Sequence, residues 1–392
     1  MSKTNENKLV PKLRFPEFEN SNEWEETTLG KITNITNGKS NAQDHIENGK
    51  YPLFDRSAII KASNNFLFDC EAVIIPGEGM KFIPKYYKGK FDLHQRAYAL
   101  KDFAVEVEGI FVYYLMMHRS DLLAKKAVKS TVLSLRLPIL QNFPIQIPKV
   151  LKEQQKIAVC LSSLDEVITA ESQKLDLLKE HKKGLLQNLF PQEGEIVPKL
   201  RFKEFEDSGE WDEKELGSFC INISSGKDKN VIDGEYELYG STGIIGRTEN
   251  VSYEGDFILV ARVGANAGLL NKVKGKFGVT DNTLVIDLVK KDLINFIFYS
   301  LESVGLNKLV FGSGQPLITG RQLKNLLISI PSSEHEQKKI VDILSSIDDL
   351  IYLQSQKIET LKLHKKGLLQ GLFPDINEEN SSNSMELEND RN

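Results

Sequence analysis

Basic residues interleaved with aromatic residues are the most informative chemical pattern in this sequence. Residues 81–91 (KFIPKYYKGKF) place four lysines among two phenylalanines and two tyrosines, and three further lysines precede Phe277. Flexible cations of this kind contact phosphate oxygens, and planar or amide groups contact base edges. The pattern suggests a nucleic-acid surface, but a lysine-rich hairpin that merely faces solvent would have the same composition.

Polar loops add candidates at matching places in the two halves of the chain. Lys129 and Arg136 precede one apolar closing segment, and Gln315 and Arg321 precede another. An ordinary turn would explain these residues equally well. The complete set of expected nucleic-acid contacts is Lys39, Arg56, Lys81, Lys85, Lys88, Lys90, Arg96, Lys129, Arg136, Lys227, Arg247, Arg262, Lys272, Lys274, Lys276, Gln315 and Arg321.

No pattern typical of catalysis or of metal binding emerges. Residues 38–40 (GKS) resemble the end of a phosphate-binding loop, but that motif requires a glycine where Thr33 stands. Residues 77–79 (GEG) and 312–314 (GSG) lack the third glycine of a dinucleotide fingerprint. The Asn-Pro-Pro-aromatic run of amino-methyltransferases is also missing. We therefore expect no catalytic residue, no metal ligand and no cofactor in this chain.

Composition and cysteine usage place the chain among ordinary globular proteins. The 392 residues are 40% hydrophobic and 27% charged, which predicts two or three domains. The isolated Cys70, Cys160 and Cys220 argue against a disulfide framework and against a zinc cluster. No apolar run reaches membrane-spanning length, and the first residues lack the apolar core of a signal peptide. We expect a cytoplasmic protein.

The net charge of −5 does not exclude a nucleic-acid partner. Residues 375–392 hold six acids against one base and so account for the whole net charge, which predicts an acidic, disordered tail. The remainder is close to neutral, and a neutral body can still present basic faces.

A long heptad helix occurs twice, at residues 153–191 and 336–374, with a constant offset of 183 residues and no gap. Apolar residues alternate in steps of four and three, and the matching pairs Glu171/Gln354 and Lys182/Lys365 interrupt them. This spacing predicts a coiled-coil seam. The seam residues are Ile157, Leu161, Leu164, Ile168, Leu175, Leu178, Leu185 and Leu189 in the first copy, and Ile340, Leu344, Ile347, Ile351, Ile358, Leu361, Leu368 and Leu372 in the second.

Two helices of one chain with the same heptad phase most simply pair with each other. Each should have about 33 residues and a length of roughly 50 Å. We expect antiparallel pairing, which would make the repeat a pseudo-twofold. Parallel pairing would need the chain to return along the helices between the two copies, and the second globular segment could span that distance.

A second repeat precedes each globular segment. Residues 10–32 and 197–219 share the phrase VPKLRF and place Trp24 and Trp211 at matching positions. Each segment then has short β-type runs, a helix-like run (108–127 or 292–310) and a closing strand phrase (140–148 or 323–331). The fold class is mixed α/β or α+β, with two similar domains in tandem.

These repeats predict seven parts. They are the leader and first lead-in (1–24), the first globular domain (25–150), the first long helix (151–192), the second lead-in (193–211), the second globular domain (212–331), the second long helix (332–374) and the acidic tail (375–392).

The combination of repeated phrases resembles the specificity subunit of type I restriction–modification systems. Three phrases carry the resemblance, each present twice: VPKLRF…W…LG, LxNxxIxIP–EQxKI and HKKGLLQxLFP. They extend over nearly the whole chain apart from the leader and the tail. The resemblance implies that the globular segments are target-recognition domains, each reading one half of a split, asymmetric site in double-stranded DNA. The helices would then be the spacer that fixes the gap.

The resemblance also implies partners. Two methyltransferase subunits would dock on the helices, restriction subunits could join through them, and S-adenosylmethionine, ATP and Mg²⁺ would belong to those partners. Lys182-Lys183 and Lys365-Lys366, expected to face away from the seam, are candidates for this interface, although solvated helix faces would look the same. The alternative is a two-domain coiled-coil scaffold unrelated to restriction. A self-sufficient methyltransferase or nuclease is disfavoured by the missing cofactor motifs.

Overall fold

The computed structural model describes residues 9–129, 131–311 and 317–374, which form two compact units. Unit 1 combines Met1–Glu171 with Lys357–Asn392, and unit 2 is Ser172–Gln356. Each unit therefore contains one lead-in, one globular segment and parts of both long helices. The candidate Gln315 and the acidic tail lie outside the described residues.

The two heptad regions form the helices α5 (Leu151–Leu189) and α8 (Glu334–Leu372). Each has 39 residues, more than the roughly 33 expected, because the helix begins upstream of the first seam residue. Pro148 and Pro331 precede the helices and Pro191 and Pro374 follow them, in keeping with the poor fit of proline to a helix interior.

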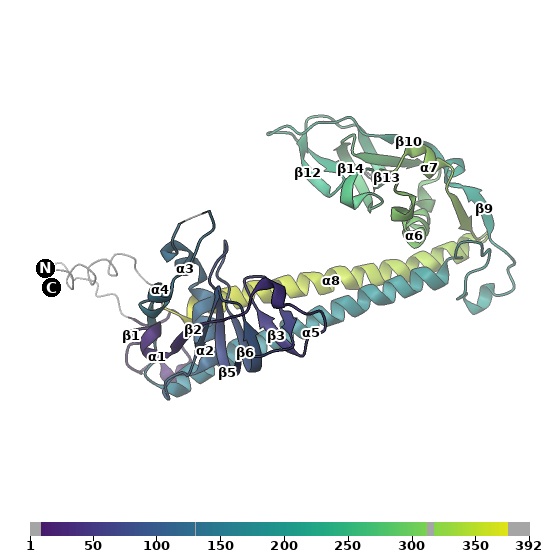
Figure 1. The fold of residues 1–392 in the computed structure, drawn as a ribbon. Coiled ribbons are helices and arrows are strands. Elements are labelled where there is room, and N and C mark those ends of the chain that lie inside the picture. Colours follow the sequence, from purple (N-terminus) through teal and green to yellow (C-terminus); the bar gives the residue numbers. More distant parts are fainter. Residues whose placement is uncertain (1–8, 130, 312–316, 375–392) are drawn as a thin grey trace. The chain divides into compact units, whose positions relative to one another are not determined.

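The helices run antiparallel where they pair within each unit (Figure 1). In unit 1, Asp165 contacts Lys365 at 2.5 Å and Glu171 contacts Lys357 at 2.5 Å, so the partner number falls as the residue number rises. In unit 2, Lys182 contacts Asp348 at 2.8 Å. The expected antiparallel pairing is confirmed. All sixteen predicted seam side chains are buried or partly buried.

A six-stranded sheet forms the globular part of unit 1. Its order is β2-β7-β5-β6-β3-β4, and all neighbours are antiparallel except β3 and β6. Helix α2 (Gly109–His118) packs against β5 (Figure 1). The strands are β2 (Asn34–Asn37), β3 (Tyr51–Phe54), β4 (Lys61–Ser63), β5 (Phe68–Pro76), β6 (Lys85–Leu93) and β7 (Ala97–Lys101).

A two-stranded ribbon and three short helices complete unit 1. The ribbon pairs the lead-in strand β1 (Glu25–Thr28) with β8 (Pro144–Ile147). The helices are α1 (Leu29–Ile32), α3 (Ser120–Lys126) and α4 (Leu137–Gln141).

Unit 2 repeats this topology. The sheet order β10-β15-β13-β14-β11-β12 again has one parallel pair, β11 with β14, and α6 (Ile294–Val304) packs against β13. The elements are β9 (Asp212–Glu215), β10 (Cys220–Ser225), β11 (Tyr236–Gly240), β12 (Gly243–Thr248), β13 (Tyr253–Ala261), β14 (Leu270–Val279), β15 (Thr283–Leu288), α7 (Gly320–Lys324) and β16 (Leu327–Ile330). Strand β16 pairs with β9 in the second ribbon.

The expected β-type runs are strands, but the helix-like runs and the closing phrases are divided in both units. In unit 2 the helix-like run 292–310 is interrupted at Gly305, after α6, and the closing phrase 323–331 begins in α7 and becomes a strand at Leu327. The helix-like run 108–127 breaks at Arg119 into α2 and α3. The closing phrase 140–148 begins as the end of α4 and becomes a strand only at Pro144. Pro138 at the start of α4 favours a helical turn there, since its fixed φ suits the first helical turn.

Each repeated lead-in forms an ion pair with the first turn of a long helix, α5 in unit 1 and α8 in unit 2. Arg14 of VPKLRF forms a two-pronged ion pair with Glu153 of α5, at 2.8 and 2.9 Å. Arg201 and Glu336 form the same pair in unit 2, at the same distances. Both glutamates are buried, so this fixed geometry explains why these two phrases recur together.

Three aromatic rings join each lead-in to the end of the other helix. Unit 1 packs Trp24, Phe111 and Phe373, with ring centroids 5.5–6.1 Å apart. Unit 2 packs Trp211, Phe296 and Phe190 at 5.5–6.1 Å. Each unit thus combines the entry of one long helix with the exit of the other.

Candidate nucleic-acid interface

A glycine–lysine pair stands beside the sheet at the same place in both units. The amide of Gly38 donates to the carbonyl of Ala97 at 3.3 Å, and that of Gly226 donates to Thr283 at 3.2 Å. A Cβ atom would collide with the carbonyl of Leu93 or of Val279, respectively, so a residue without a side chain is required. The glycine in the phosphate-loop-like sequence therefore has a packing role.

The lysines that follow these glycines, Lys39 and Lys227, are exposed. Both belong to the predicted set. Because the glycine fixes the backbone in both units, each lysine side chain starts from an equivalent backbone position.

Next to this pair, backbone hydrogen bonds join three segments of the chain in each unit. We call this meeting point the junction: residues 77, 96 and 135 in unit 1, and residues 262, 282 and 318 in unit 2. In unit 1 the amide of Gly77 donates to Arg96, and that of Leu135 donates to Gly77, both at 2.8 Å. In unit 2 Arg262 donates to Asn282 at 2.9 Å, and Ile318 donates to Arg262 at 2.8 Å. Positions 77, 96 and 135 therefore correspond to 262, 282 and 318, and the arginine belongs to a different segment of the junction in each unit.

Glu78 forms ion pairs with two arginines at the junction of unit 1. It contacts Arg96 at 2.9 Å and Arg56 at 3.8 Å, and both arginine side chains remain more than half exposed. An isolated bridge joins Glu78 to Ser134, in the segment that also carries Lys129 and Arg136, both exposed. The structure thus brings four predicted residues to one loop region.

Sequence reasoning missed the residues that organise this region. In the sequence, Glu78 stands out only as the middle residue of the GEG run, and nothing distinguishes His94 or Asp55. Burial lowers the pKa of His94; Asp55 opposes this effect, and nearby Arg96 adds to it. Burial alone would raise the pKa of Asp55, but hydrogen bonds from Lys61 and Ser57 outweigh burial and lower it.

The junction of unit 2 is less charged. Arg262 is partly buried, and its guanidinium lies 3.5 Å from the carbonyl oxygen of Asp281. Arg321, in the first turn of α7, is exposed.

Exposed lysines also lie on one hairpin of each unit. Lys88 and Lys90 flank Gly89 on β6, and Lys274 and Lys276 flank Gly275 on β14; both glycines have positive φ, 128° and 115°. Lys274 and Lys276 face Asp256 and Glu254 across the strands at 3.9 and 3.6 Å. Exposed pairs of this kind are weak and leave the lysines free to exchange partners.

Several other candidates are engaged within the protein. Lys85 is partly buried and donates to the carbonyl of Ser57 at 2.6 Å, and burial lowers the pKa of its ammonium group. Arg247 donates to the carbonyls of Gly234 and Glu235 at 2.7 and 2.5 Å. Lys272 donates to Asn295 at 2.5 Å. Lys81, the remaining lysine of the run 81–91, has an exposed side chain in the loop before β6.

The phenylalanines of the two basic runs are core residues, whereas Tyr86 and Tyr87 are partly exposed. Phe82 and Phe91 are fully buried, and Phe277 is 1% exposed. These rings cannot stack on bases in this conformation.

Lys182 and Lys365 do not face away from the seam, so that expectation was wrong. Lys365 contacts Asp165, which also accepts a hydrogen bond from Tyr114 at 2.7 Å. Lys182 forms the matching pair with Asp348, which accepts from Tyr299 at 2.8 Å. The lysine side chains are only 13–14% exposed, because each closes an ion pair between the two helices beside a tyrosine of the globular segment.

The described residues show no group of three or more His, Cys, Asp or Glu side chains placed to hold a metal ion. None of the helices in the described part of the chain is long and apolar enough to cross a membrane.

The repeated fold defines a class: chains with two similar mixed α/β domains and two long helices that pair antiparallel within each unit. The model of the type I restriction modification DNA specificity domain matches residues 21–180 and again residues 205–363. The chain belongs to this family.

Curated relatives agree with this assignment. The type I restriction enzyme MjaVIII specificity subunit of Methanocaldococcus jannaschii is 24% identical, over 92% of this chain and 93% of its own length. The EcoprrI specificity subunit of Escherichia coli is 30% identical over 38% of this chain and 39% of its own length. The EcoDI specificity subunit of Escherichia coli is 26% identical over 46% of this chain and 40% of its own length. The chain thus spans about two fifths of these two Escherichia coli relatives.

Solved structures share the fold. The type I restriction–modification S subunit from M. genitalium superposes with a TM-score of 0.64 at 17% identity, covering 94% of this chain and all of that one. A chain from a study of complex assembly and conformational transition of the type I system has a TM-score of 0.53 at 16% identity, covering 90% and 98%. The two similar domains and the paired helices are therefore a known architecture.

Proposed function

We propose that this chain is the non-catalytic DNA-recognition subunit of a type I restriction–modification complex. Each recognition domain reads one half of a bipartite, asymmetric site in double-stranded DNA. The observation that carries the proposal is the shared junction, in which one backbone framework presents Arg96 in unit 1 and Arg262 in unit 2. A common framework with different side chains is what two readers of different half-sites require.

The two kinds of matched position have different roles in this proposal. Lys39 and Lys227 are the same residue on the same backbone, so they contact phosphates, which carry no sequence information. The residues that differ between the junctions, Arg56, Arg96 and Arg136 against Arg262 and Arg321, contact base edges. Arginine suits that role because its planar fork pairs with the O6 and N7 acceptors of guanine.

The helices α5 and α8 fix the gap between the half-sites and dock two methyltransferase subunits, to which restriction subunits add. Lys183 and Lys366 remain candidates for that interface because they are exposed, unlike the neighbouring Lys182 and Lys365. S-adenosylmethionine, ATP and Mg²⁺ serve the methylation and cleavage reactions on the partner subunits. This chain determines the DNA sequence at which those reactions occur.

The proposal is tested by mapping methyladenine across the genome of the source cell with and without this gene. The expected result is loss of methylation at one bipartite motif with a fixed gap, which would give both half-sites at once. A reconstituted complex should bind that motif with strong salt dependence, since phosphate contacts release counterions. An unchanged map together with salt-insensitive binding would favour a scaffold outside restriction.

A further inference from the structure

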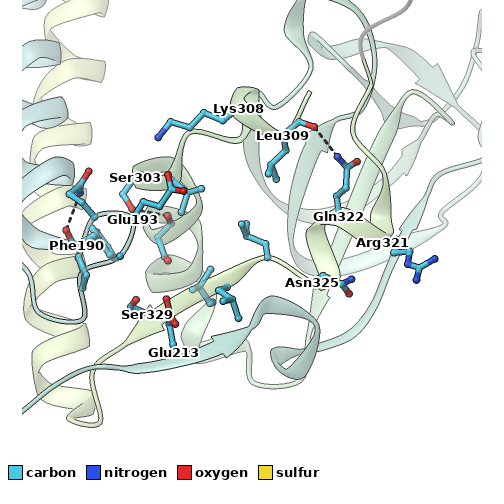
Figure 2. A pocket seen from close by; sticks show the side chains of 18 of the residues that line it. Phe190, Glu193, Glu213, Ser303, Lys308, Leu309, Arg321, Gln322, Asn325 and Ser329 are labelled. Carbon is cyan, nitrogen blue, oxygen red and sulfur yellow. Dashed lines mark hydrogen bonds between the residues drawn. The ribbon is translucent and has the colours of Figure 1, made fainter. Parts of the chain in front are cut away.

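Unit 2 contains an open pocket that borders the proposed DNA-reading surface at Arg321 and extends from there to the ribbon of β9 and β16 (Figure 2). Its volume is about 890 Å³, and its walls are the end of α6, the ribbon of β9 and β16, the start of α7 and the residues that follow α5. Glu213 and Ser329 lie together on the ribbon side, opposite Ser303 of α6 (Figure 2).

The two units can be aligned at this pocket residue by residue. Tyr114 and Tyr299 each donate to an aspartate on a long helix, and Phe111 and Phe296 each stack in an aromatic trio. Both pairs are 185 residues apart, which aligns α2 with α6 and places Val304 where unit 1 has Arg119.

The ribbons align in the same way. Glu26 lies opposite Gln146 in unit 1, and Glu213 lies opposite Ser329 in unit 2. Pro374 and Pro191 each follow the phenylalanine of the aromatic trio.

In unit 1 the chain fills the corresponding space with an arginine of its own. Arg119 is 6% exposed and donates to the side-chain oxygen of Gln146 at 3.2 Å and to the carbonyl of Pro374. Gln146 in turn lies 3.4 Å from the carboxylate of Glu26, and His118 stacks on Phe373. An arginine thus packs its stem in this space and places its charged end among oxygen acceptors.

Unit 2 keeps acceptors of the same kind but loses the side chains that fill the space. Val304 replaces Arg119 and Ser303 replaces His118, while Ser329 replaces Gln146. The Glu213 carboxylate and the Ser329 hydroxyl remain in the wall, with Pro191 at its edge. Glu193 adds a second carboxylate, whereas the cationic Lys308 and Arg321 lie on other sides of the pocket (Figure 2).

We propose that this pocket binds an arginine side chain presented by another protein. The guanidinium group occupies the Glu213 and Ser329 side, and the stem packs along Val304 and Ile328. Arginine fits better than lysine because its planar fork donates to several acceptors at once. The proposal goes beyond DNA reading, because it assigns a protein-binding function to the ribbon side of the pocket, where Glu213 and Ser329 lie.

The first test uses the full chain with labelled Ile, Leu and Val methyl groups and N-acetyl-arginine methylamide as the probe. We expect saturable NMR shifts at Val304, Ile328 and Leu309, with Ile145 of the filled unit 1 site unchanged. The V304R substitution should abolish the shifts by filling the pocket from within, and E213Q should weaken binding about tenfold. If V304R does not fold, S329Q gives a second, smaller filling.

Any of three results with the probes and variants would overturn the arginine assignment, in addition to a lack of saturation. They are equal shifts with the neutral citrulline analogue, stronger shifts with the leucine analogue, or shifts that persist in V304R. Absence of saturation in the wild-type chain would overturn it as well.

The second test asks whether a protein presents the arginine, and it rests on the proposed function for its choice of partner. Association with the purified methyltransferase and restriction subunits is measured for the wild type, V304R and the control V304A. V304R should weaken association with one of them at least tenfold, and V304A should not. If neither association changes, the protein-partner proposal fails. Binding of the DNA motif is measured on the same samples, so failure of the DNA role is seen separately.

Discussion

Units 1 and 2 share a framework and differ in what they present on it. Both have the same sheet order, the same arginine–glutamate anchor, the same aromatic trio and the same lysine–aspartate–tyrosine cluster. They differ at the basic junction and at the space beside α2 or α6. The shared contacts hold the fold, whereas the differing positions include exposed arginines, the buried Arg119 of unit 1 and the open pocket of unit 2.

The aromatic trios should give the largest effects, each confined to its own unit. F373A removes a fully buried ring from unit 1 and F190A removes one from unit 2, so each should cost about 3–5 kcal/mol of local stability. Amide hydrogen exchange read unit by unit measures this. L363A, at a side chain that is 70% exposed, is the matched control. Equal loss of protection in both units for either variant would contradict the assignment of each ring to one unit.

The ion-pair clusters of Lys182 in unit 2 and Lys365 in unit 1 should contribute different amounts to the free energy of unfolding. Lys182 contacts both Glu302 and Asp348, whereas Lys365 contacts Asp165, and Met117 stands where unit 2 has Glu302. K182M leaves two carboxylates facing each other and should cost about 2–3 kcal/mol, whereas K365M should cost about 1–2 kcal/mol.

Urea unfolding of both variants measures this difference. The double substitution K182M/E302M, which copies unit 1, should recover part of the loss. A larger cost for K365M than for K182M would show that charge is not the cause.

The junction arginines should distinguish the two half-sites. R96A should weaken binding by about 1–2 kcal/mol and relax base preference in one half-site, and R262A should do the same in the other. K39A and K227A should weaken binding of all sequences alike and reduce the slope of log K against log salt by about 1 each. Binding to a library of sites at several salt concentrations measures both effects. Loss of preference in both half-sites on R96A would contradict the division between the units.

The repeats make much of this architecture predictable from sequence, because heptad spacing and duplicated phrases report on geometry that is used twice. Charges within those repeats are harder to interpret. Lys182 interrupts an apolar seam, and the spacing alone does not show that Asp348 of the other helix meets it. The role of Glu78 is equally hard to predict from the sequence. It depends on ion pairs with Arg56 and Arg96, which come together only when three loops meet in the fold.

The pocket was not predictable for a related reason. It depends on small residues that stand where the other unit has Arg119 and Gln146, and two diverged segments can be aligned this finely only after their strands are paired.

The smallest expected effect concerns acid stability at a position where only unit 1 has a charge. The amide of His94 donates to the carbonyl of Phe54, and Thr280 donates likewise to Tyr239, so Asp55 of unit 1 corresponds to Gly240 of unit 2. Because the pKa of Asp55 is lowered in the folded state, its stabilising contribution is complete above the unfolded-state pKa of about 3.9. It is lost as the pH falls through the lower folded-state pKa.

D55N should therefore destabilise unit 1 most near neutral pH, and the difference from wild type should shrink below about pH 4. Amide hydrogen exchange, read unit by unit across this pH range, measures the effect, and exchange in unit 2 should not change. The control is D233N, a substitution of the same kind at an exposed site. A difference that stayed constant from pH 6 to pH 3 would mean that Asp55 acts through its shape and neutral hydrogen bonds. The acid sensitivity of unit 1 would then have to come from other groups, and the contrast with Gly240 would be one of packing and not of charge.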